Sequence, residues 1–165
     1  MQVLTPFGHR PLDRWLLSGM EGGKMANITK IMDMLDWHMS SEIQSEGRRL
    51  AKNIDTIIPF IQPLTPRHNK NVWENCALII AEEKDEVLKP YLIELLEWLQ
   101  DMNWPGALRI QYRLLNYANS TSLFNAIDTC VKQAKADNDE TWEMNLYLFL
   151  QMRREHSTGD GLREP

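Results

Sequence analysis

The feature that most constrains the fold is a helical spacing of apolar residues that repeats from about residue 27 to residue 154. Apolar side chains recur at intervals of three and four in one run after another, as at Ile28, Ile31, Met32 and Leu35. No run alternates apolar and polar residues between tight-turn dipeptides, the pattern of a strand. The connections are short, so neighbouring helices must be antiparallel. The sequence therefore predicts an all-α fold.

The predicted helices fall into four antiparallel pairs, which are 28–39 with 42–53, 55–62 with 71–83, 86–100 with 105–118, and 121–136 with 139–154. Trp73, Trp104 and Trp142 lie close to the start of the second helix in the last three pairs, at spacings of 31 and 38 residues. A period of this size made of helix pairs is typical of an α-solenoid. We expect a right-handed, HEAT-like α-solenoid of about four pairs, although the units are shorter than the usual ~40–47 residues.

The stretch NWPGALRI, residues 103–110, shows how one such pair would begin. Pro105 suits the first turn of a helix, and we expect Asn103 or Trp104 to cap it. Gly106 would allow the preceding pair to approach closely. We interpret the repeated tryptophans as packing between stacked pairs rather than as a binding feature, because large aromatic side chains dominate buried area.

Polar residues ahead of the other helical runs predict where those helices begin. The expected caps are Ser40 or Ser41, Asn71, Asp85, and Ser120 or Ser122.

The two ends of the chain differ from the helical segment. Residues 1–24 lack the periodicity, and MEGGKM (20–25) reads like a translated bacterial ribosome-binding site ahead of a start codon. We therefore expect a native start at Met25 and a non-native or disordered extension over 1–24. Residues 25–154 would form a single helical domain, and 155–165 a disordered tail.

Composition and charge exclude several classes of protein. Hydrophobic residues make up 43% and charged residues 25% of the chain, as in an ordinary soluble protein. The net charge of −5 disfavours nucleic acid and anionic membranes as partners. No apolar run approaches the ~20 residues of a membrane span. Cys76 and Cys130 lie within apolar helical runs, which favours reduced core thiols in a cytoplasmic protein.

Several segments resemble a bacterial family catalogued as a domain of unknown function. The resemblance lies in WHMSSEIQSEGRRLAKNI, PFIQPL, KNVWENCALII and LKPYLIELLEWLQDMNWPGA, and it covers roughly residues 28–150. The family is a small HEAT-like helical domain, and some of its members are associated with toxin–immunity loci. The resemblance implies a helical fold and a protein-binding or immunity role. It supplies no catalytic residue.

The motifs of known chemistry are missing. His9, His38, His68 and His156 never pair at helical spacing, and there is no HExxH, CxxC or EF-hand pattern. Neither cysteine has a nearby histidine, and no GxSxG or phosphate-binding loop occurs. We expect a protein that is not an enzyme and needs no cofactor or metal.

Charged residues supply the candidate binding surface. Residues 71–101 carry eight carboxylates against two lysines, and residues 121–165 add a net charge of −3. This balance is either a solvated face or an acidic surface that docks a basic partner, such as a toxin domain. Arg109 and Arg113, with Tyr112 and Tyr117 nearby, could contact nucleic acid, but pairing with neighbouring carboxylates is the favoured interpretation.

Six residues are the candidate partner-binding positions: Glu74, Arg109, Arg113, Asp139, Glu140 and Glu143. The first hypothesis is a bacterial immunity protein that neutralises a toxin by occlusion, as a monomer or weak homodimer. A general helical scaffold or adaptor is the alternative. A HEAT-like enzyme that processes nucleic acid is the third hypothesis.

Overall fold

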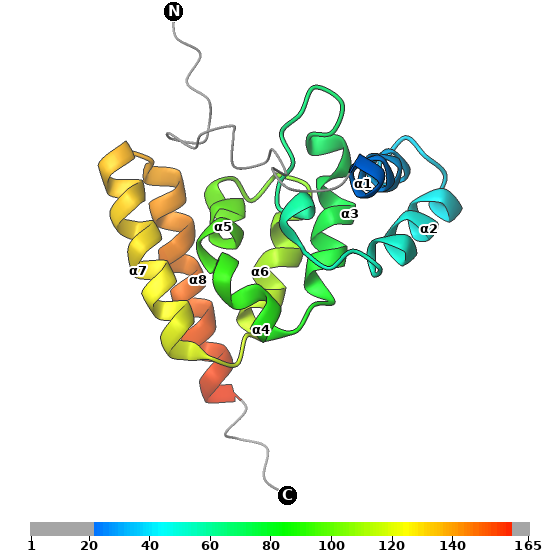
Figure 1. The fold of residues 1–165 in the computed structure, drawn as a ribbon. Coiled ribbons are helices and arrows are strands. Elements are labelled where there is room, and N and C mark those ends of the chain that lie inside the picture. Colours follow the sequence, from blue (N-terminus) through cyan, green and yellow to red (C-terminus); the bar gives the residue numbers. More distant parts are fainter. Residues whose placement is uncertain (1–21, 160–165) are drawn as a thin grey trace, which may run out of the picture.

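The computed structural model describes residues 22–159, and every regular element in this part of the chain is helical (Figure 1). The α-helices are α1 (Gly22–Met34), α2 (Ser41–Ala51), α3 (Lys70–Ala81), α4 (Asp85–Leu88), α5 (Leu92–Leu96), α6 (Ala107–Leu115), α7 (Ser120–Asp137) and α8 (Glu140–Gly159). Three short 3-10 helices join them: η2 (Ile58–Phe60), η3 (Lys89–Tyr91) and η4 (Glu97–Gln100). The all-α prediction is confirmed.

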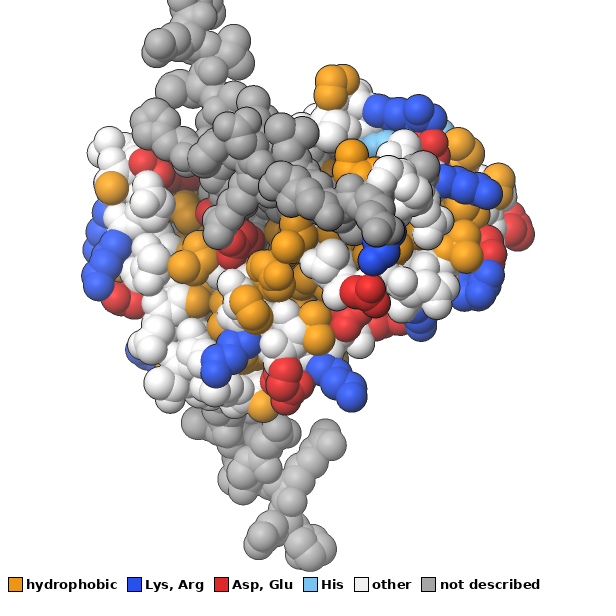
Figure 2. Space-filling view, in the orientation of Figure 1, with side chains coloured by type: hydrophobic (Ala, Val, Ile, Leu, Met, Phe, Trp, Pro, Cys, Tyr) orange, Lys and Arg blue, Asp and Glu red, His pale blue; other side chains and the backbone are white. Residues whose placement is uncertain are grey.

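Helices that are distant in the sequence lie side by side. Helix α2 packs on α3, α3 on α6 and α6 on α8, so that these four helices are successive neighbours. In addition, α5 contacts α7, and η4 contacts α8. In Figure 1, α7 and α8 lie along one edge of the molecule and α1 and α2 lie at the opposite edge. Figure 2 shows hydrophobic side chains gathered over the middle of this face, with charged side chains around them.

Two predicted helices differ from the structure. The prediction of a helix over 55–62 is wrong, since only the 3-10 turn η2 forms there. Pro59 and Pro63 each lack an N–H donor, and Gln62 takes a left-handed φ of 41°, so an α-helix cannot continue. The helix expected over 86–100 is divided into α4, η3, α5 and η4, and Pro90 lies at the first break.

The ends of the helical segment also shift. Helix α1 ends at Met34, earlier than the expected 39. Helix α8 continues to Gly159 and so takes in residues 155–159, which we expected to belong to the tail. Helix α1 begins at Gly22 and so takes in residues 22–24 of the expected extension, whereas residues 1–21 and 160–165 lie outside the described residues.

Three tryptophans meet in the core between α3, η4 and α6. Trp73 and Trp98 are fully buried, and Trp104 is 9% exposed. The Trp73 ring meets Trp98 at 6.0 Å and Trp104 at 5.4 Å between centroids, both edge to face. The indole N–H groups of Trp73 and Trp98 donate to the carbonyl oxygens of Pro63 and Pro105. The cluster confirms that Trp73 and Trp104 pack between helices, and it adds Trp98, which the spacing did not reveal.

Helix α6 begins at Ala107, and its N-cap residue Gly106 takes a left-handed φ of 84°. The expected caps Asn103 and Trp104 lie in the turn before it, as does Pro105. A Cβ atom at position 106 would lie 2.5 Å from the Cβ of Ala77 and 2.9 Å from the carbonyl oxygen of Trp73. The absence of a side chain therefore sets how closely α6 approaches α3, as the sequence predicts.

The predicted cap residue is right for α2, whereas the observed caps of α3, α4 and α7 are other residues nearby. Ser40 caps α2, as expected, by accepting from the N–H of Ile43. Asn69 caps α3 in place of Asn71, and Asn119 caps α7 in place of the two serines. Asp85 is the first residue of α4 rather than its cap.

Buried polar side chains connect successive helices through backbone carbonyls. Asn75 of α3 is 4% exposed and donates to the carbonyl oxygen of Leu35, which follows α1, at 2.7 Å. Arg153 of α8 is 7% exposed and donates to the carbonyl oxygen of Tyr117 at 2.5 Å. Each bond satisfies a carbonyl just beyond the end of a helix, where no backbone partner remains.

Replacing Gly106 with alanine should destabilise the protein. Strain at positive φ and overlap with Ala77 each cost about 1–3 kcal/mol, so we expect a loss of at least about 2 kcal/mol in the free energy of unfolding, measured by urea denaturation. Gly23→Ala is the matched control, since a Cβ there meets nothing within 4 Å. It should be neutral or stabilising by up to about 1 kcal/mol. Equal effects of the two changes would contradict this account of position 106.

Replacing Trp104 with alanine should lower the free energy of unfolding by about 3–5 kcal/mol, because it removes a large side chain from the tryptophan cluster. Trp37→Ala, at a side chain 49% exposed, should have a much smaller effect in the same denaturation assay. If Trp104→Ala left stability intact and abolished partner binding instead, the packing interpretation would be wrong.

Candidate functional site

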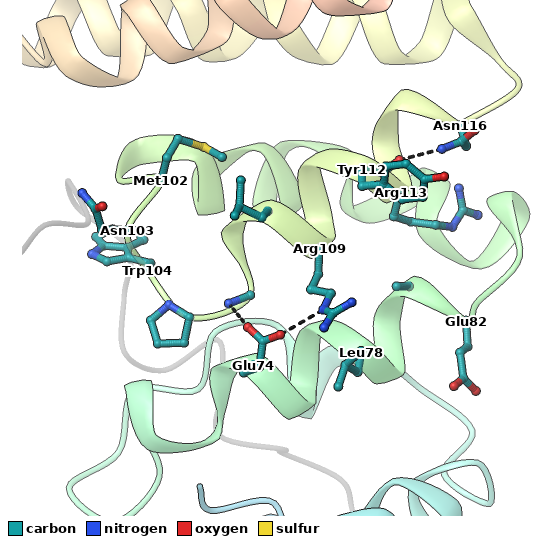
Figure 3. Close-up of a pocket in the computed structure, with 14 residues that line it drawn as sticks. Glu74, Leu78, Glu82, Met102, Asn103, Trp104, Arg109, Tyr112, Arg113 and Asn116 are labelled. Carbon is teal, nitrogen blue, oxygen red and sulfur yellow. Dashed lines mark hydrogen bonds and ion pairs between the residues drawn. The ribbon is translucent and has the colours of Figure 1, made fainter. Parts of the chain in front are cut away.

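The candidate site is a groove of about 930 Å³ between α3 and α6 (Figure 3). Its apolar lining comes from Leu78, Ala81, Met102, Trp104, Pro105, Leu108 and Tyr112. Its polar lining comes from Glu74, Glu82, Asn103, Arg109, Arg113 and Asn116. Three of the six sequence-predicted positions, Glu74, Arg109 and Arg113, therefore lie in one groove.

Glu74 joins the two walls of the groove where α6 begins. Its Oε2 accepts from the backbone N–H of Gly106 at 2.7 Å, and its Oε1 accepts from Nε of Arg109 at 2.9 Å. The side chains of Glu74 and Arg109 are 44% and 56% exposed. Figure 3 shows Arg109 reaching down from α6 toward Glu74 on α3. This pair neutralises charge at the groove and satisfies an N–H at the start of α6.

Arg113 lies one turn further along α6 and is held more tightly. Its guanidinium lies 2.5 Å from Oδ1 of Asp85 and donates to the carbonyl oxygen of Glu83 at 2.8 Å. The other oxygen of Asp85 accepts from the N–H of Ala118 at 2.7 Å. The side chains of Arg113 and Asp85 are 15% and 24% exposed. Both arginines are therefore paired with carboxylates, as the favoured interpretation predicts.

Asp85 is held ionised by this network. Burial alone would raise the pKa of Asp85, but hydrogen bonds from Ala118 and Arg113 and the charges of Arg113 and Arg153 outweigh burial. The pKa of Asp85 is therefore lower than its ordinary value.

The groove also exposes two large apolar side chains that the charge-based prediction missed. Leu108 and Tyr112 are 67% and 70% exposed and lie one turn apart on α6. Ile110 and Leu114 of the same helix are buried. The helical phase of 107–115 could have identified the exposed pair, because Leu108 and Tyr112 fall off the buried stripe.

The other three predicted positions lie near the start of α8, away from the groove. Asp139 accepts from the N–H of Trp142 at 2.9 Å, as a helix cap does. Glu143 pairs with Lys135 at 3.4 Å. Glu140 and Glu143 line a smaller hollow of about 340 Å³ along α8. The six residues thus belong to two separate surfaces.

At least four of the eight carboxylates in residues 71–101 have partners within the protein. Of the carboxylates in 71–101, Glu74 pairs with Arg109, Asp85 with Arg113 and Glu82 with Lys52. Asp101 accepts from the N–H of Asn103. The net charge of this segment is therefore a poor guide to the charge that a partner would meet at the groove.

Metal and thiol chemistry have little support among the described residues. Within 22–159, no group of three or more His, Cys, Asp or Glu side chains could hold a metal ion. Both cysteines are buried, and burial raises the pKa of Cys76, which disfavours a reactive thiolate. No helix in the same range has the length and apolar character needed to cross a membrane.

The chain belongs to the family described as Domain of unknown function (DUF5071), whose model matches residues 64–164. The match takes in α3 through α8 and therefore both walls of the groove, whereas α1 and α2 lie outside it. No curated protein and no solved structure matches the chain. The expected resemblance to a domain of unknown function is confirmed, over a segment that begins later than residue 28.

Replacing Asp85 with asparagine should lower the free energy of unfolding at pH 7 by about 1–3 kcal/mol, because a charge-assisted pair with Arg113 is lost. A carboxyl whose pKa is lowered by folding stabilises the protein above its unfolded pKa of about 4, and this contribution disappears as pH falls through the folded value. The difference between the variant and the parent should therefore shrink below about pH 4 in urea denaturation. A difference that is constant from pH 7 to pH 3 would contradict it.

Proposed function

We propose that this protein is a non-enzymatic protein-binding module that holds its partner in the groove between α3 and α6. The observation that carries the proposal is the exposure of Leu108 and Tyr112 beside a groove of about 930 Å³. Exposed aromatic and aliphatic side chains next to a concave surface are the usual anchors of protein interfaces. A helix or loop of a partner could bury both.

The pairing of the charges in the groove favours binding over catalysis. An active site generally gathers titratable groups with shifted pKa values that face the substrate. Here Arg113 and Asp85 hold each other, and Asp85 also receives the N–H of Ala118. Arg109 is engaged with Glu74. These groups hold α6 in place, and they leave the apolar side chains as the groups available to a ligand.

We further infer that the helices stack as a right-handed, HEAT-like solenoid. The support is the order of contacts, in which α2, α3, α6 and α8 are successive neighbours and α5 contacts α7. In such stacks one helix of each pair lines a concave surface that binds partners. The groove between α3 and α6 would then be part of that surface, and η2 would stand in place of a first helix in the second pair.

The most specific form of the proposal is a bacterial, cytoplasmic immunity protein that neutralises a toxin domain by occlusion. The resemblance noted in the sequence and the net charge of −5 support a basic partner. Because the charges in the groove are paired, we assign affinity to Leu108 and Tyr112, and assign the faster encounter with a basic toxin to the acidic chain as a whole. A scaffold or adaptor would use the same groove with another protein.

Leu108→Asp and Tyr112→Ala should each weaken binding of the toxin encoded beside this gene by tenfold or more, since an anchor is worth about 2 kcal/mol. Calorimetry would give the affinity, and survival of toxin-expressing cells would give the neutralisation. Phe124→Ala, at an α7 side chain 40% exposed outside the groove, is the control and should bind normally.

Two results would overturn the proposal at different levels. If the toxin kills cells that express the protein as readily as cells that lack it, the immunity role is wrong. If a partner binds and both groove variants bind it as tightly as the parent, the groove is not the binding surface.

A further inference from the structure

Three consecutive residues in the turn between α1 and α2, Asp36, Trp37 and His38, are joined by side-chain hydrogen bonds. The indole Nε1–H of Trp37 donates to Nε2 of His38 at 3.2 Å, and Nδ1 of His38 lies 2.7 Å from Oδ1 of Asp36. The rings of Trp37 and His38 meet edge to face at 5.9 Å between centroids. None of the three residues lines the groove between α3 and α6, so this series is separate from the candidate site.

The hydrogen bonds determine which nitrogen of His38 carries the proton. An indole nitrogen can donate a hydrogen bond but cannot accept one, so Nε2 of His38 must be unprotonated to face Trp37. The neutral imidazole then carries its proton on Nδ1, from which it donates to Asp36. His38 is therefore neutral and in the Nδ1–H form when it is bonded to Trp37.

Asp36 is fixed in place and so orients the imidazole ring. Its Oδ1 also accepts the backbone N–H of His38 at 2.8 Å, and its Oδ2 accepts from the side-chain amide of Asn71 in α3 at 2.6 Å. Burial alone would raise the pKa of Asp36, but these hydrogen bonds and the charge of His38 outweigh burial, so the pKa is lower than its ordinary value. Asp36 therefore stays ionised between about pH 5 and pH 8, the range in which histidine side chains generally change charge.

The surroundings of His38 supply no competing charge in the part of the chain that the structure describes. Asp36 is the charged side chain that pairs with His38. Helix α3 contributes the uncharged Asn71 to this turn, and α2 contributes the uncharged Gln44, which donates to the carbonyl oxygen of Met39 at 2.6 Å. The side chain of His38 is 78% exposed, so a proton reaches Nε2 directly from water.

His68 has the opposite arrangement and provides a comparison within the same molecule. Its Nε2 lies 2.7 Å from Oδ1 of Asp33, and an ionised carboxylate only accepts, so the proton of neutral His68 is on Nε2. A second proton would bind Nδ1 and leave the contact with Asp33 intact. The two histidines should therefore differ in tautomer and in what protonation does to their contacts.

We propose that Asp36 and His38 form a proton-controlled latch on Trp37, in which neutral His38 holds the indole and protonation of His38 releases it. The second proton binds Nε2, which then becomes a donor and can no longer accept from the indole N–H. The charged ring keeps its ion pair with Asp36, so His38 stays in place while Trp37 loses its acceptor. Trp37 is 49% exposed and Met39 in the same turn is 41% exposed, so acid alters the apolar surface at this edge of the molecule. The inference does not depend on the proposed function.

Nuclear magnetic resonance of the imidazole nitrogens tests the tautomers in the ¹⁵N-labelled full chain. At about pH 8, His38 should be mainly in the Nδ1–H form and His68 mainly in the Nε2–H form. His38→Gln and His68→Gln identify the two sets of signals by removing them. An Nε2–H form or an even mixture at His38 would overturn the proposal, because that ring could not hold Trp37.

A titration from about pH 8 to pH 5 tests the release of the indole. The Nε1–H resonance of Trp37, identified by its loss in Trp37→Phe, should shift away from its hydrogen-bonded position with the same midpoint as the ring signals of His38. The indole of Trp142, which donates to the carbonyl oxygen of Leu96 in the core, is the internal control and should not shift. In His38→Gln the Trp37 resonance should show no transition in this range. A Trp37 resonance that stays fixed while His38 titrates, or that shifts equally in His38→Gln, would overturn the latch.

Discussion

The contact between α3 and α6 at Gly106 is the constraint on which the rest of the structure depends. Position 106 has a left-handed backbone and no room for a Cβ against Ala77. That close approach brings Trp104 against Trp73 and lets Glu74 reach the N–H of Gly106. The same contact fixes the floor of the groove, so the stability of the core and the shape of the candidate site have one origin.

The features that sequence reasoning predicted well are those set by local periodicity and by size. The helical spacing of apolar residues identified the all-α fold, and the bulk of Trp73 and Trp104 identified packing between helices. The identity of the helix caps and the structure of residues 55–63 were less predictable. Several Asn and Ser residues lie at the starts of α2, α3 and α7, and tertiary contacts choose among them. At α3, Asn71 donates to Asp36, and Asn69 is the cap. Between Asp55 and Pro63, apolar spacing alone could not show that the prolines permit only one 3-10 turn.

The sequence identified three residues that line the candidate site, but it did not show that their charges are paired. Glu74, Arg109 and Arg113 were selected for their charge, and all three line the groove. Arg109 is 35 residues away from its partner Glu74 in the sequence, and Arg113 is 28 residues away from its partner Asp85. The net charge of a short sequence segment therefore could not reveal these pairs. The three candidates near the start of α8 lie on another surface, because a charge pattern carries no information about which helices are neighbours.

Binding in the groove would change the spectroscopic signals of Trp104. Its indole lines the groove, is 9% exposed, and lies edge to face with the fully buried Trp73. A molecule that enters the groove must exclude water from an indole that is in contact with a second one. Occupancy would therefore alter the wavelength of tryptophan emission and the near-ultraviolet circular dichroism of the pair. Because Trp104 packs in the core and also lines the groove, its optical signals would report binding in the groove without an added label.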